Sequence, residues 1–215
     1  MEIKITTLSP IHIGSGKADV NLDAEIVHDK YGIPYFPGKR FRGLLYESAL
    51  EITEMKPLQN KAFADPKILR ELFNQTADTP VILTMHNFYP PHYRELCQDL
   101  EYLQDKYGDI IDAQDVLAYY TDIRFQTKID DRTGIAADTS LHNMRVVDQG
   151  VDFVGELEVC GDPDRTENHR ILLALALKNL RYAGSKRNRG FGKIDCRMTD
   201  DKLMAELIEK ALRKE

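Results

Sequence analysis

Residues 168–180 restrict the possible folds of this chain more than any other segment. The run Ile171–Leu177 within them is apolar at every position, so a helix formed there has no polar side to turn toward solvent and must be buried. Residues 2–8 alternate polar and apolar side chains, as a half-buried strand does, and residues 190–197 form another expected strand after the buried segment. Strands at both ends of the chain with a buried helix between them predict an α+β fold in which helices cover a sheet.

The remaining expected elements fit this arrangement. Pro37-Gly38 opens a helix whose apolar residues recur at helical spacing. The best candidate is a ferredoxin-like fold, the architecture of RNA-recognition modules, in one domain over residues 1–215 with a helical insertion at 55–120 and a hairpin at 123–147. The expected helices are 39–53, 65 or 66 to 73, 92–107, 112–120, 168–180 and 201–214, and the expected strands are 2–8, 21–29, 81–88, 123–128, 142–147, 151–159 and 190–197.

The segment Gly184–Lys193 carries three glycines, four cations, one aromatic residue and no carboxylate. Glycine lets backbone N–H groups approach another group closely, and consecutive N–H groups form a concave anion site. Arginine grips a phosphate through two parallel hydrogen bonds, so the natural ligand of such a loop is a phosphodiester chain. The glycine spacing fits neither a Walker loop nor a dinucleotide fingerprint. A solvated basic turn is the alternative interpretation.

The net charge of −6 would by itself argue against a nucleic-acid partner, but the charges are segregated along the chain. Residues 181–197 hold six cations against one acid, whereas residues 148–167 hold seven acids against one cation. A protein that binds nucleic acid with one face needs only that face to be positive. Lys39, Arg40 and Arg42 at the start of an expected helix oppose its macrodipole, which favours an anion there; chance with solvation is the alternative.

The cysteine content indicates the redox state of the compartment in which the protein is expected. Cys97, Cys160 and Cys196 are far apart and odd in number, which favours a reducing environment over a disulfide framework. The N-terminal residues fit a strand rather than a signal peptide, and no apolar run approaches the length of a membrane span. We therefore expect a cytoplasmic protein with no membrane partner.

Four segments resemble the repeat-associated mysterious proteins (the RAMP superfamily) of CRISPR systems. Gly184–Lys193 resembles their glycine loop, and Ser9–Gly16 resembles the loop after their first strand. Leu22–Gly43 contains an aspartate, a short strand, a turn and then a proline-glycine pair that opens a basic helix. This order is similar to that in the backbone subunit of type III (Csm/Cmr-type) effector complexes. Ile129–Ala136 resembles the thumb hairpin of that subunit, and all four segments occur in the family's order.

The resemblance implies a fold and an activity. Such subunits have an RNA-recognition-like palm, a helical lid and a protruding thumb, and they self-associate along a guide CRISPR RNA together with other effector subunits. Each thumb displaces one base of the duplex between the guide and the complementary target RNA. Active members cleave the target beside each displaced base. The resemblance thus implies an endoribonuclease that works at regular intervals within a ribonucleoprotein complex.

Asp23 matches the catalytic aspartate of the active members, which the resemblance also makes the ligand of a divalent metal, with Mg²⁺ as the expected ion. A carboxylate can take a proton from a ribose 2′-hydroxyl group, directly or through water, or hold Mg²⁺ beside the phosphate. Asp19, Glu25 and Asp29 are nearby rivals for this role. A turn-capping function of Asp23 is the simpler alternative.

In this family, sequence recognition would come from base pairing between guide and target, so the protein needs to read only backbone shape and charge. The family more often has serines where Lys39 and Arg40 stand. Tyr119, Tyr120 and Phe125 are expected in the core, with base stacking as the alternative. The candidate RNA-binding residues are His12, Gly14, Ser15, Gly16, Lys39, Arg40, Arg42, Arg132, Gly184, Ser185, Lys186, Arg187, Arg189, Gly190 and Gly192.

Three other functions stay open on the sequence. The chain could be a non-catalytic structural subunit that coats guide RNA, or a stand-alone, metal-independent ribonuclease that cuts guide precursors with His12 as general base. It could also be an RNA-binding module unrelated to CRISPR. The leading hypothesis requires the turns 12–16 and 184–193 to lie on the same side of the molecule, because one RNA strand has to touch both.

Overall fold

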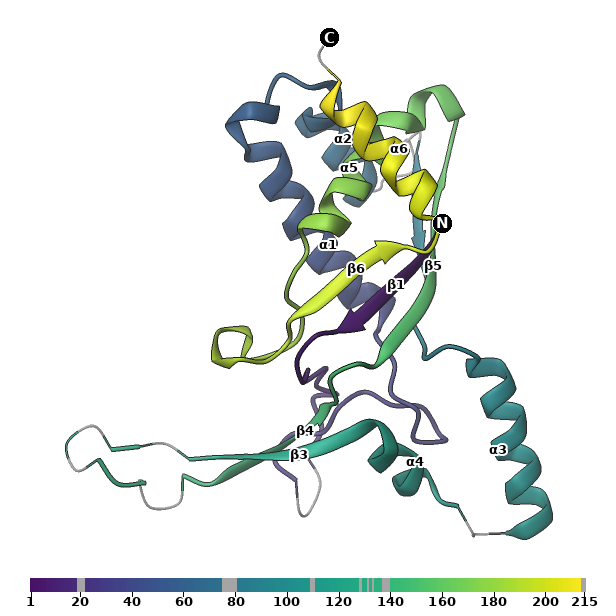
Figure 1. The fold of residues 1–215 in the computed structure, drawn as a ribbon, viewed down its shortest axis with the longest axis vertical. Helices are drawn as coiled ribbons and strands as arrows, with labels where there is room; N and C mark the ends of the chain where they lie inside the picture. Colours follow the sequence, from purple (N-terminus) through teal and green to yellow (C-terminus); the bar gives the residue numbers. More distant parts are fainter. Residues whose placement is uncertain are drawn as a thin grey trace.

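The computed structural model describes residues 1–18, 22–74, 81–108, 111–127, 129–130, 132, 134–136 and 140–213. These residues form a mixed α/β structure with antiparallel sheets (Figure 1). The strands are β1 (Glu2–Thr7), β2 (Ile82–Met85), β3 (Thr121–Gln126), β4 (His142–Val147), β5 (Asp152–Cys160) and β6 (Ile194–Met198). The helices are α1 (Gly38–Glu54), α2 (Pro66–Phe73), α3 (Tyr93–Tyr107), α4 (Ala113–Tyr120), α5 (Pro163–Asn179) and α6 (Asp201–Leu212), with short 3-10 turns η1 (Lys56–Leu58), η2 (Ala62–Ala64) and η3 (Arg187–Arg189).

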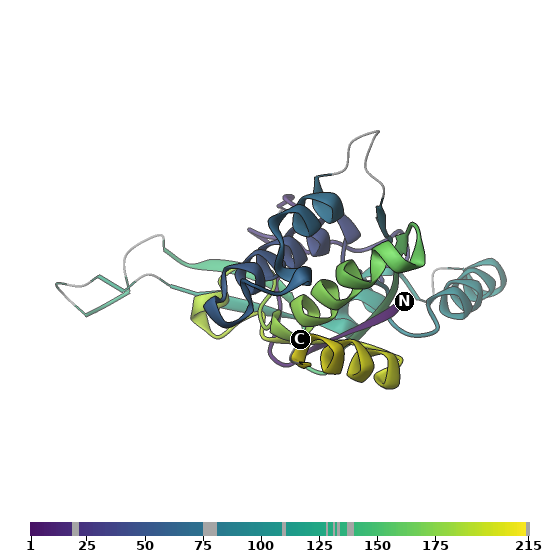
Figure 2. The same cartoon turned by 90° about the horizontal axis from the view of Figure 1, so that it is seen from above.

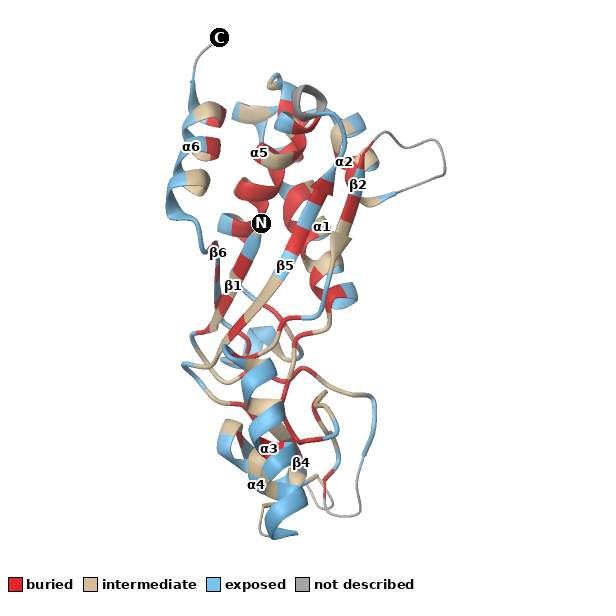
Figure 3. Cartoon of the chain, turned by 90° about the vertical axis from the view of Figure 1, so that its right-hand side faces the viewer, coloured by how far each residue is buried: buried red, intermediate tan, exposed pale blue. Residues whose placement is uncertain are grey.

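The main sheet has four strands in the order β2-β5-β1-β6, and every neighbouring pair is antiparallel. Ile5 in β1 lies opposite Phe153 of β5 on one side and Cys196 of β6 on the other. All three side chains are buried, because this face of the sheet packs against helices. The opposite face carries alternating polar residues and is not covered by α1 or α5; Figure 3 views the chain from that side.

Two helices form the core together with the sheet. In α1 the residues Phe41, Leu45, Ala49 and Ile52 recur at helical spacing and are buried. The apolar run 171–177 of α5 packs against α1, α2, η2, α6 and the sheet, so the predicted buried helix is confirmed. Its first residue is Pro163 rather than the expected Asn168.

One predicted strand is replaced by an irregular segment. Residues 21–29 were expected to form a strand, but the described residues 22–36 follow an irregular path with isolated bridges. Ile26 bridges Gly14, whereas Ala24 bridges Met144 of β4. A continuous ladder needs one partner strand, and here successive residues pair with different segments. The predicted strand 190–197 is similarly shortened, because its first residues complete the glycine turn.

Residues 55–120 do not form a single helical insertion. Strand β2 within this range belongs to the main sheet and divides it in two. The helices before β2, namely η2 and α2, pack on α1 and α5. Helices α3 and α4 lie at the other end of the molecule, where Leu100, Tyr31 and Ile33 form a small separate core. The expected helices at 65 or 66 to 73, 92–107 and 112–120 are themselves present.

Strands β3 and β4 form a two-stranded hairpin that extends away from the body on the side opposite α3 (Figures 1 and 2). The expected hairpin 123–147 begins earlier, because Thr121 already pairs with Val147. The expected burial of Tyr119 and Phe125 is wrong, since their exposed fractions are 81% and 64%. Part of the hairpin end, including Asp131 and Thr133, lies outside the described residues.

No helix within the described residues has both the length and the apolar character needed to cross a bilayer.

The alternation along β5 generates a stability prediction. Phe153→Ala should lower the free energy of unfolding by about 3–5 kcal/mol, because it leaves a cavity in the fully buried face of the sheet. Val154→Ala, on the adjacent residue of the opposite face, should lower it by less than about 1 kcal/mol. Chemical denaturation of the two variants measures the difference, and equal losses would contradict the assigned burial of the sheet faces.

Candidate nucleic-acid interface

The two glycine-bearing turns lie side by side. The Ser185 N–H donates to the His12 carbonyl oxygen at 3.1 Å, and the Gly192 N–H donates to the Pro10 carbonyl oxygen at 2.9 Å. A Cβ atom at Gly184 would lie 2.6 Å from the His12 carbonyl oxygen, so glycine is needed for this close approach. The structure therefore meets the requirement that turns 12–16 and 184–193 lie on one side of the molecule.

The glycine turn is a closed loop between α5 and β6. The Ala183 N–H donates to the Gly192 carbonyl oxygen at 2.8 Å and closes its base. Gly184, Gly190 and Gly192 have positive φ angles, as does Lys186 with φ of 57°. Such alternation of backbone conformation turns successive N–H groups toward one side, which is the geometry of an anion-binding concavity.

Two cations of this turn already have partners. The Lys186 ammonium donates to Gln126 Oε1 of β3 at 2.6 Å, which links the turn to the hairpin. The Arg187 guanidinium lies 3.8 Å from the Glu47 carboxylate of α1, and both side chains are largely exposed. Such an exposed pair contributes little stability, so an RNA phosphate can compete for Arg187. The Arg189 side chain is exposed.

An open cleft of about 720 Å³ runs between these segments. Its walls come from turn 12–18, the segment 23–25, one side of α1 and the start of the glycine turn. The Arg40 guanidinium donates to the Gly14 carbonyl oxygen at 2.5 Å and closes one side. The predicted site residues that line the cleft are His12, Gly14, Gly16, Asp23, Arg40, Gly184 and Ser185.

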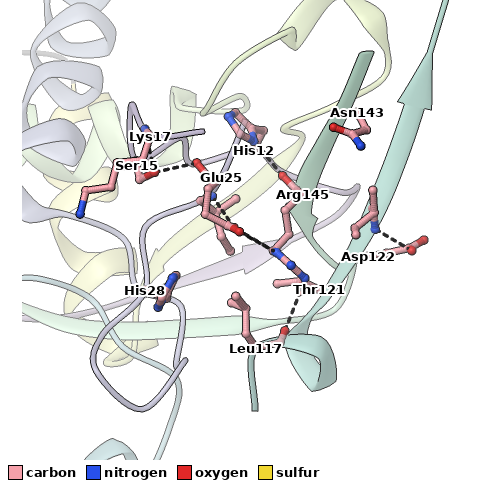
Figure 4. Close-up of polar contacts among 12 residues, drawn as sticks. His12, Ser15, Lys17, Glu25, His28, Leu117, Thr121, Asp122, Asn143 and Arg145 are labelled. Carbon is pink, nitrogen blue, oxygen red and sulfur yellow. Dashed lines mark hydrogen bonds and ion pairs between the residues drawn. The ribbon is translucent and has the colours of Figure 1, made fainter. Parts of the chain in front are cut away.

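The His12 ring is fixed in position. Its exposed fraction is 6%, and its Nδ1 lies 2.7 Å from the Arg145 carbonyl oxygen (Figure 4). Because a carbonyl oxygen can only accept, Nδ1 carries the proton of this hydrogen bond. A Cβ atom at Gly14 would lie 2.6 Å from Nε2, so Gly14 provides the space for the ring. His12 thus connects the first turn to β4.

Arg145 organises the base of the hairpin. Its Nε lies 3.0 Å from Glu25 Oε1, and its Nη1 donates to Thr121 Oγ1 at 3.2 Å (Figure 4). Thr121 Oγ1 in turn donates to the Leu117 carbonyl oxygen at 2.6 Å. Both charged side chains are nearly buried. No motif in the sequence singled out Arg145; its position in the strand pattern 142–147 was the only available signal.

Asp23 lies where the cleft meets the hairpin. Its Oδ2 accepts from the Asn143 N–H at 2.8 Å, and its own N–H donates to Asn143 Oδ1 at 2.8 Å. His142 Nδ1 is 3.6 Å from the same carboxylate oxygen. Asp23 is therefore an exposed carboxylate that links two distant segments, and the interpretation of it as a local turn cap does not describe these contacts.

The rival carboxylates have other roles or are not described. Glu25 is paired with Arg145. Asp29 accepts hydrogen bonds from the N–H groups of Tyr31 and Ile33, so it caps the turn before α1. Asp19 lies outside the described residues.

A divalent metal would find one suitable ligand at this position. Within the described residues no three His, Cys, Asp or Glu side chains form a group that could hold a metal. Asp23 Oδ2 is engaged by Asn143, which leaves Oδ1 as the available oxygen. Mg²⁺ is commonly bound by one or two carboxylates together with substrate phosphates and water. Asp23 fits that mode of binding and does not by itself form a complete metal cage.

Several predicted site residues lie outside the cleft. The Arg42 guanidinium donates to the Phe73 carbonyl oxygen at 2.9 Å, so it faces α2 and ties the end of that helix to α1. Lys39 is exposed at the start of α1 and does not line the cleft. Arg132 lies toward the end of the hairpin, where its N–H donates to Asp130 Oδ1 at 2.9 Å. Lys17 lines the cleft but was not singled out from the sequence.

Comparisons with known proteins identify the family and the fold. The family model described as the RAMP superfamily matches residues 4–195. The chain belongs to the RAMP superfamily. Solved structures have a similar fold. A chain of the type III-B Cmr-beta complex bound to cognate target RNA is 12% identical, with a TM-score of 0.61 over 96% of this chain and 98% of that chain.

A chain of the type III-B Cmr-beta complex in its apo state is 13% identical to this RAMP protein, with a TM-score of 0.62 over 93% of this chain and 97% of that chain. No curated protein matches significantly. The chain therefore has the fold of a Cmr-complex subunit across nearly its whole length.

The contact between the two turns generates a prediction with a matched control. Gly184→Ala should lower the free energy of unfolding by about 2–4 kcal/mol, because it adds a clash with the His12 carbonyl to the strain of a positive φ. Gly190→Ala has a similar φ but no atom within 4 Å of the added methyl group, so we expect about 1 kcal/mol. Urea denaturation measures both; a larger loss in Gly190→Ala would refute the contact.

Proposed function

We propose that this RAMP protein is a guide-RNA-binding backbone subunit of a type III CRISPR complex and that it cleaves target RNA with Asp23. The main support is one arrangement: turns 12–16 and 184–193 flank a cleft, and Asp23 lies at its rim beside the hairpin. The family membership and the likeness to a chain of an RNA-bound Cmr complex support the same function.

The topology supports a ferredoxin-like palm. The elements β1, α1, β2, β5, α5 and β6 follow the order strand, helix, strand, strand, helix, strand, and the sheet order is β2-β5-β1-β6. We assign the β3–β4 hairpin as the thumb and the helical groups around α2 and α3 as candidates for the lid. In a complex, the projecting hairpin would contact RNA and neighbouring copies of the chain, with other effector subunits as further partners.

Guide RNA would be bound through its backbone. The positive-φ positions of the glycine turn orient backbone N–H groups toward one side, and Arg187, Arg189 and Arg40 add charge close to it. Phosphate contacts of this kind do not depend on sequence, which suits a subunit whose specificity is delegated to base pairing. His12 would act as a positioning residue, because its ring fixes the first turn to β4.

Asp23 would take part in the cleavage of the target. The 2′-oxygen of a ribose attacks the adjacent phosphorus, the bond from phosphorus to the 5′-oxygen breaks, and the 2′-hydroxyl proton passes to the Asp23 carboxylate, directly or through water. The 5′-oxygen leaves with a proton from solvent. A divalent ion held beside Asp23 would neutralise the charge that develops on the phosphate. Asn143 fixes the carboxylate during this transfer, since it engages Oδ2 and leaves Oδ1 toward the substrate.

Of the alternatives, a non-catalytic structural subunit is the one that a specific observation favours. The other two carboxylates that line the described part of the cleft face cations, because Glu25 is paired with Arg145 and Glu47 lies 3.8 Å from the Arg187 guanidinium. A precursor ribonuclease that uses His12 as general base is less well supported, because this ring is buried.

The cleavage of target RNA by the assembled complex tests the role of Asp23. Asp23→Asn keeps an oxygen for the Asn143 N–H but removes the negative charge, so we expect the cleavage rate to fall by about 100-fold or more while RNA binding is retained. Asp195→Asn, which removes an exposed carboxylate from the uncovered sheet face, is the matched control and should cleave normally. Regular cleavage by the assembled complex with Asp23→Asn would show that Asp23 is not the catalytic residue.

The contact with Asn143 leads to a second functional prediction. Asn143→Ala removes the acceptor of the Asp23 N–H, which should let the carboxylate shift and slow cleavage by about 10- to 100-fold without weakening RNA binding. Asn143→Asp keeps that acceptor and should retain more activity than Asn143→Ala. Single-turnover rates and filter binding separate the two effects. A wild-type rate in Asn143→Ala would show that this contact does not orient the carboxylate.

A further inference from the structure

A second groove lies on a different part of the molecule. It has a volume of about 740 Å³ and is bordered by the uncovered face of the main sheet and by the segment that leads from β2 into α3. It shares no residue with the RNA cleft. Glu2 of β1 and Glu156 of β5 form the sheet side of this groove, and Tyr89, Pro91 and Tyr93 form the other side.

The groove is acidic, and its acids are not neutralised within the described part of the chain. Glu2 and Glu156 are direct cross-strand partners, and like charges directly opposite one another destabilise a sheet. Glu95 adds a third carboxylate, and Arg94 is the only Lys or Arg among the lining residues. None of the ion pairs among the described residues involves Glu2, Glu95 or Glu156.

Two other acids of this sheet face do have partners. The Lys4 ammonium lies 2.6 Å from the Asp152 carboxylate, and Arg197 lies 4.0 Å from Asp195. The lining residues thus hold three carboxylates against one guanidinium, and the His86 and His92 side chains are exposed beside them. At neutral pH the groove therefore has an excess of negative charge and repels a phosphodiester chain.

The aromatic side of the groove is rigid. The rings of Tyr89 and Tyr93 are stacked with centroids 3.9 Å apart, and Tyr35 lies next to Tyr89 at 5.3 Å. The Tyr93 hydroxyl donates to Asp29 Oδ2 at 3.0 Å. Burial, together with hydrogen bonds to Cys97 and Asp29, raises the pKa of Tyr93, so its hydroxyl stays protonated. Stacked, anchored rings offer a preformed surface for a guanidinium group or a proline ring.

We propose that this groove docks an extended, arginine-rich segment of a partner protein. Its guanidinium groups would pair with Glu2 and Glu156 and would relieve the repulsion between these carboxylates. The aliphatic or proline residues between them would lie on the stacked tyrosines. This inference goes beyond the proposed RNA function and does not depend on it, since no residue of the RNA cleft takes part.

Binding of a short fluorescent peptide of alternating Arg and Pro to the purified chain tests the proposal. Fluorescence anisotropy should show saturable binding, and the double variant Glu2→Gln/Glu156→Gln should bind at least about tenfold more weakly. The control variant Glu54→Gln/Glu101→Gln removes two exposed carboxylates outside the groove and the same net charge, and it should bind as the parent chain does.

Tyr93→Phe, which keeps the ring, should bind the peptide almost normally, whereas Tyr93→Ala should bind it more weakly. Circular dichroism of each variant verifies folding. Equal losses in the two glutamine double variants would mean that the peptide senses only the net charge of the chain, and this would overturn the proposal.

Discussion

The ion pair between Glu25 and Arg145 is the interaction on which the arrangement of the cleft between turns 12–16 and 184–193 depends. Arg145 lies in β4, at the base of the hairpin, and Glu25 lies in the irregular segment that passes beneath turn 12–16. Removing one partner of a nearly buried ion pair leaves an uncompensated charge in the protein. The resulting loss of stability is much larger than the small gain that an exposed ion pair provides. The same strand also holds His12 and Asp23, through the Arg145 carbonyl and through Asn143. Strand β4 thereby positions both turn 12–16 and the segment 23–25, which line the cleft.

Charge is distributed over the molecule so that two different surfaces result. Arg40 and Lys17 line one cleft beside the start of the basic glycine turn, whereas the uncovered sheet face carries Glu2 and Glu156, which form no ion pair among the described residues. A net charge of −6 thus coexists with a surface suited to phosphates. In the function that we propose, the acidic face keeps RNA away from the sheet and leaves it open to protein partners.

The sequence allowed a correct prediction of most helices and of the family, because these rest on local information. The apolar run 171–177 has no polar side, so it had to form a buried helix. The turn after it was recognisable from its composition of glycines and cations. Predictions that depended on distant partners were less successful. The segment 21–29 has the composition of a strand but no single neighbour to pair with. Phe125 is aromatic and was expected in the core, yet it lies on a hairpin that projects into solvent.

For the candidate site, too, the sequence indicated local features but did not indicate the contacts between distant residues. The sequence by itself determined which residues are candidates for phosphate contacts, since glycines and cations in Gly184–Lys193 would act through their own backbone and charge. Through the resemblance to the RAMP superfamily, the sequence also indicated Asp23 as the candidate catalytic residue. Only the tertiary structure decided that Arg42 faces α2, that Glu25 pairs with Arg145 and that Asn143 engages Asp23. These contacts join residues far apart in the chain, and no local pattern encodes which distant polar group a side chain will meet.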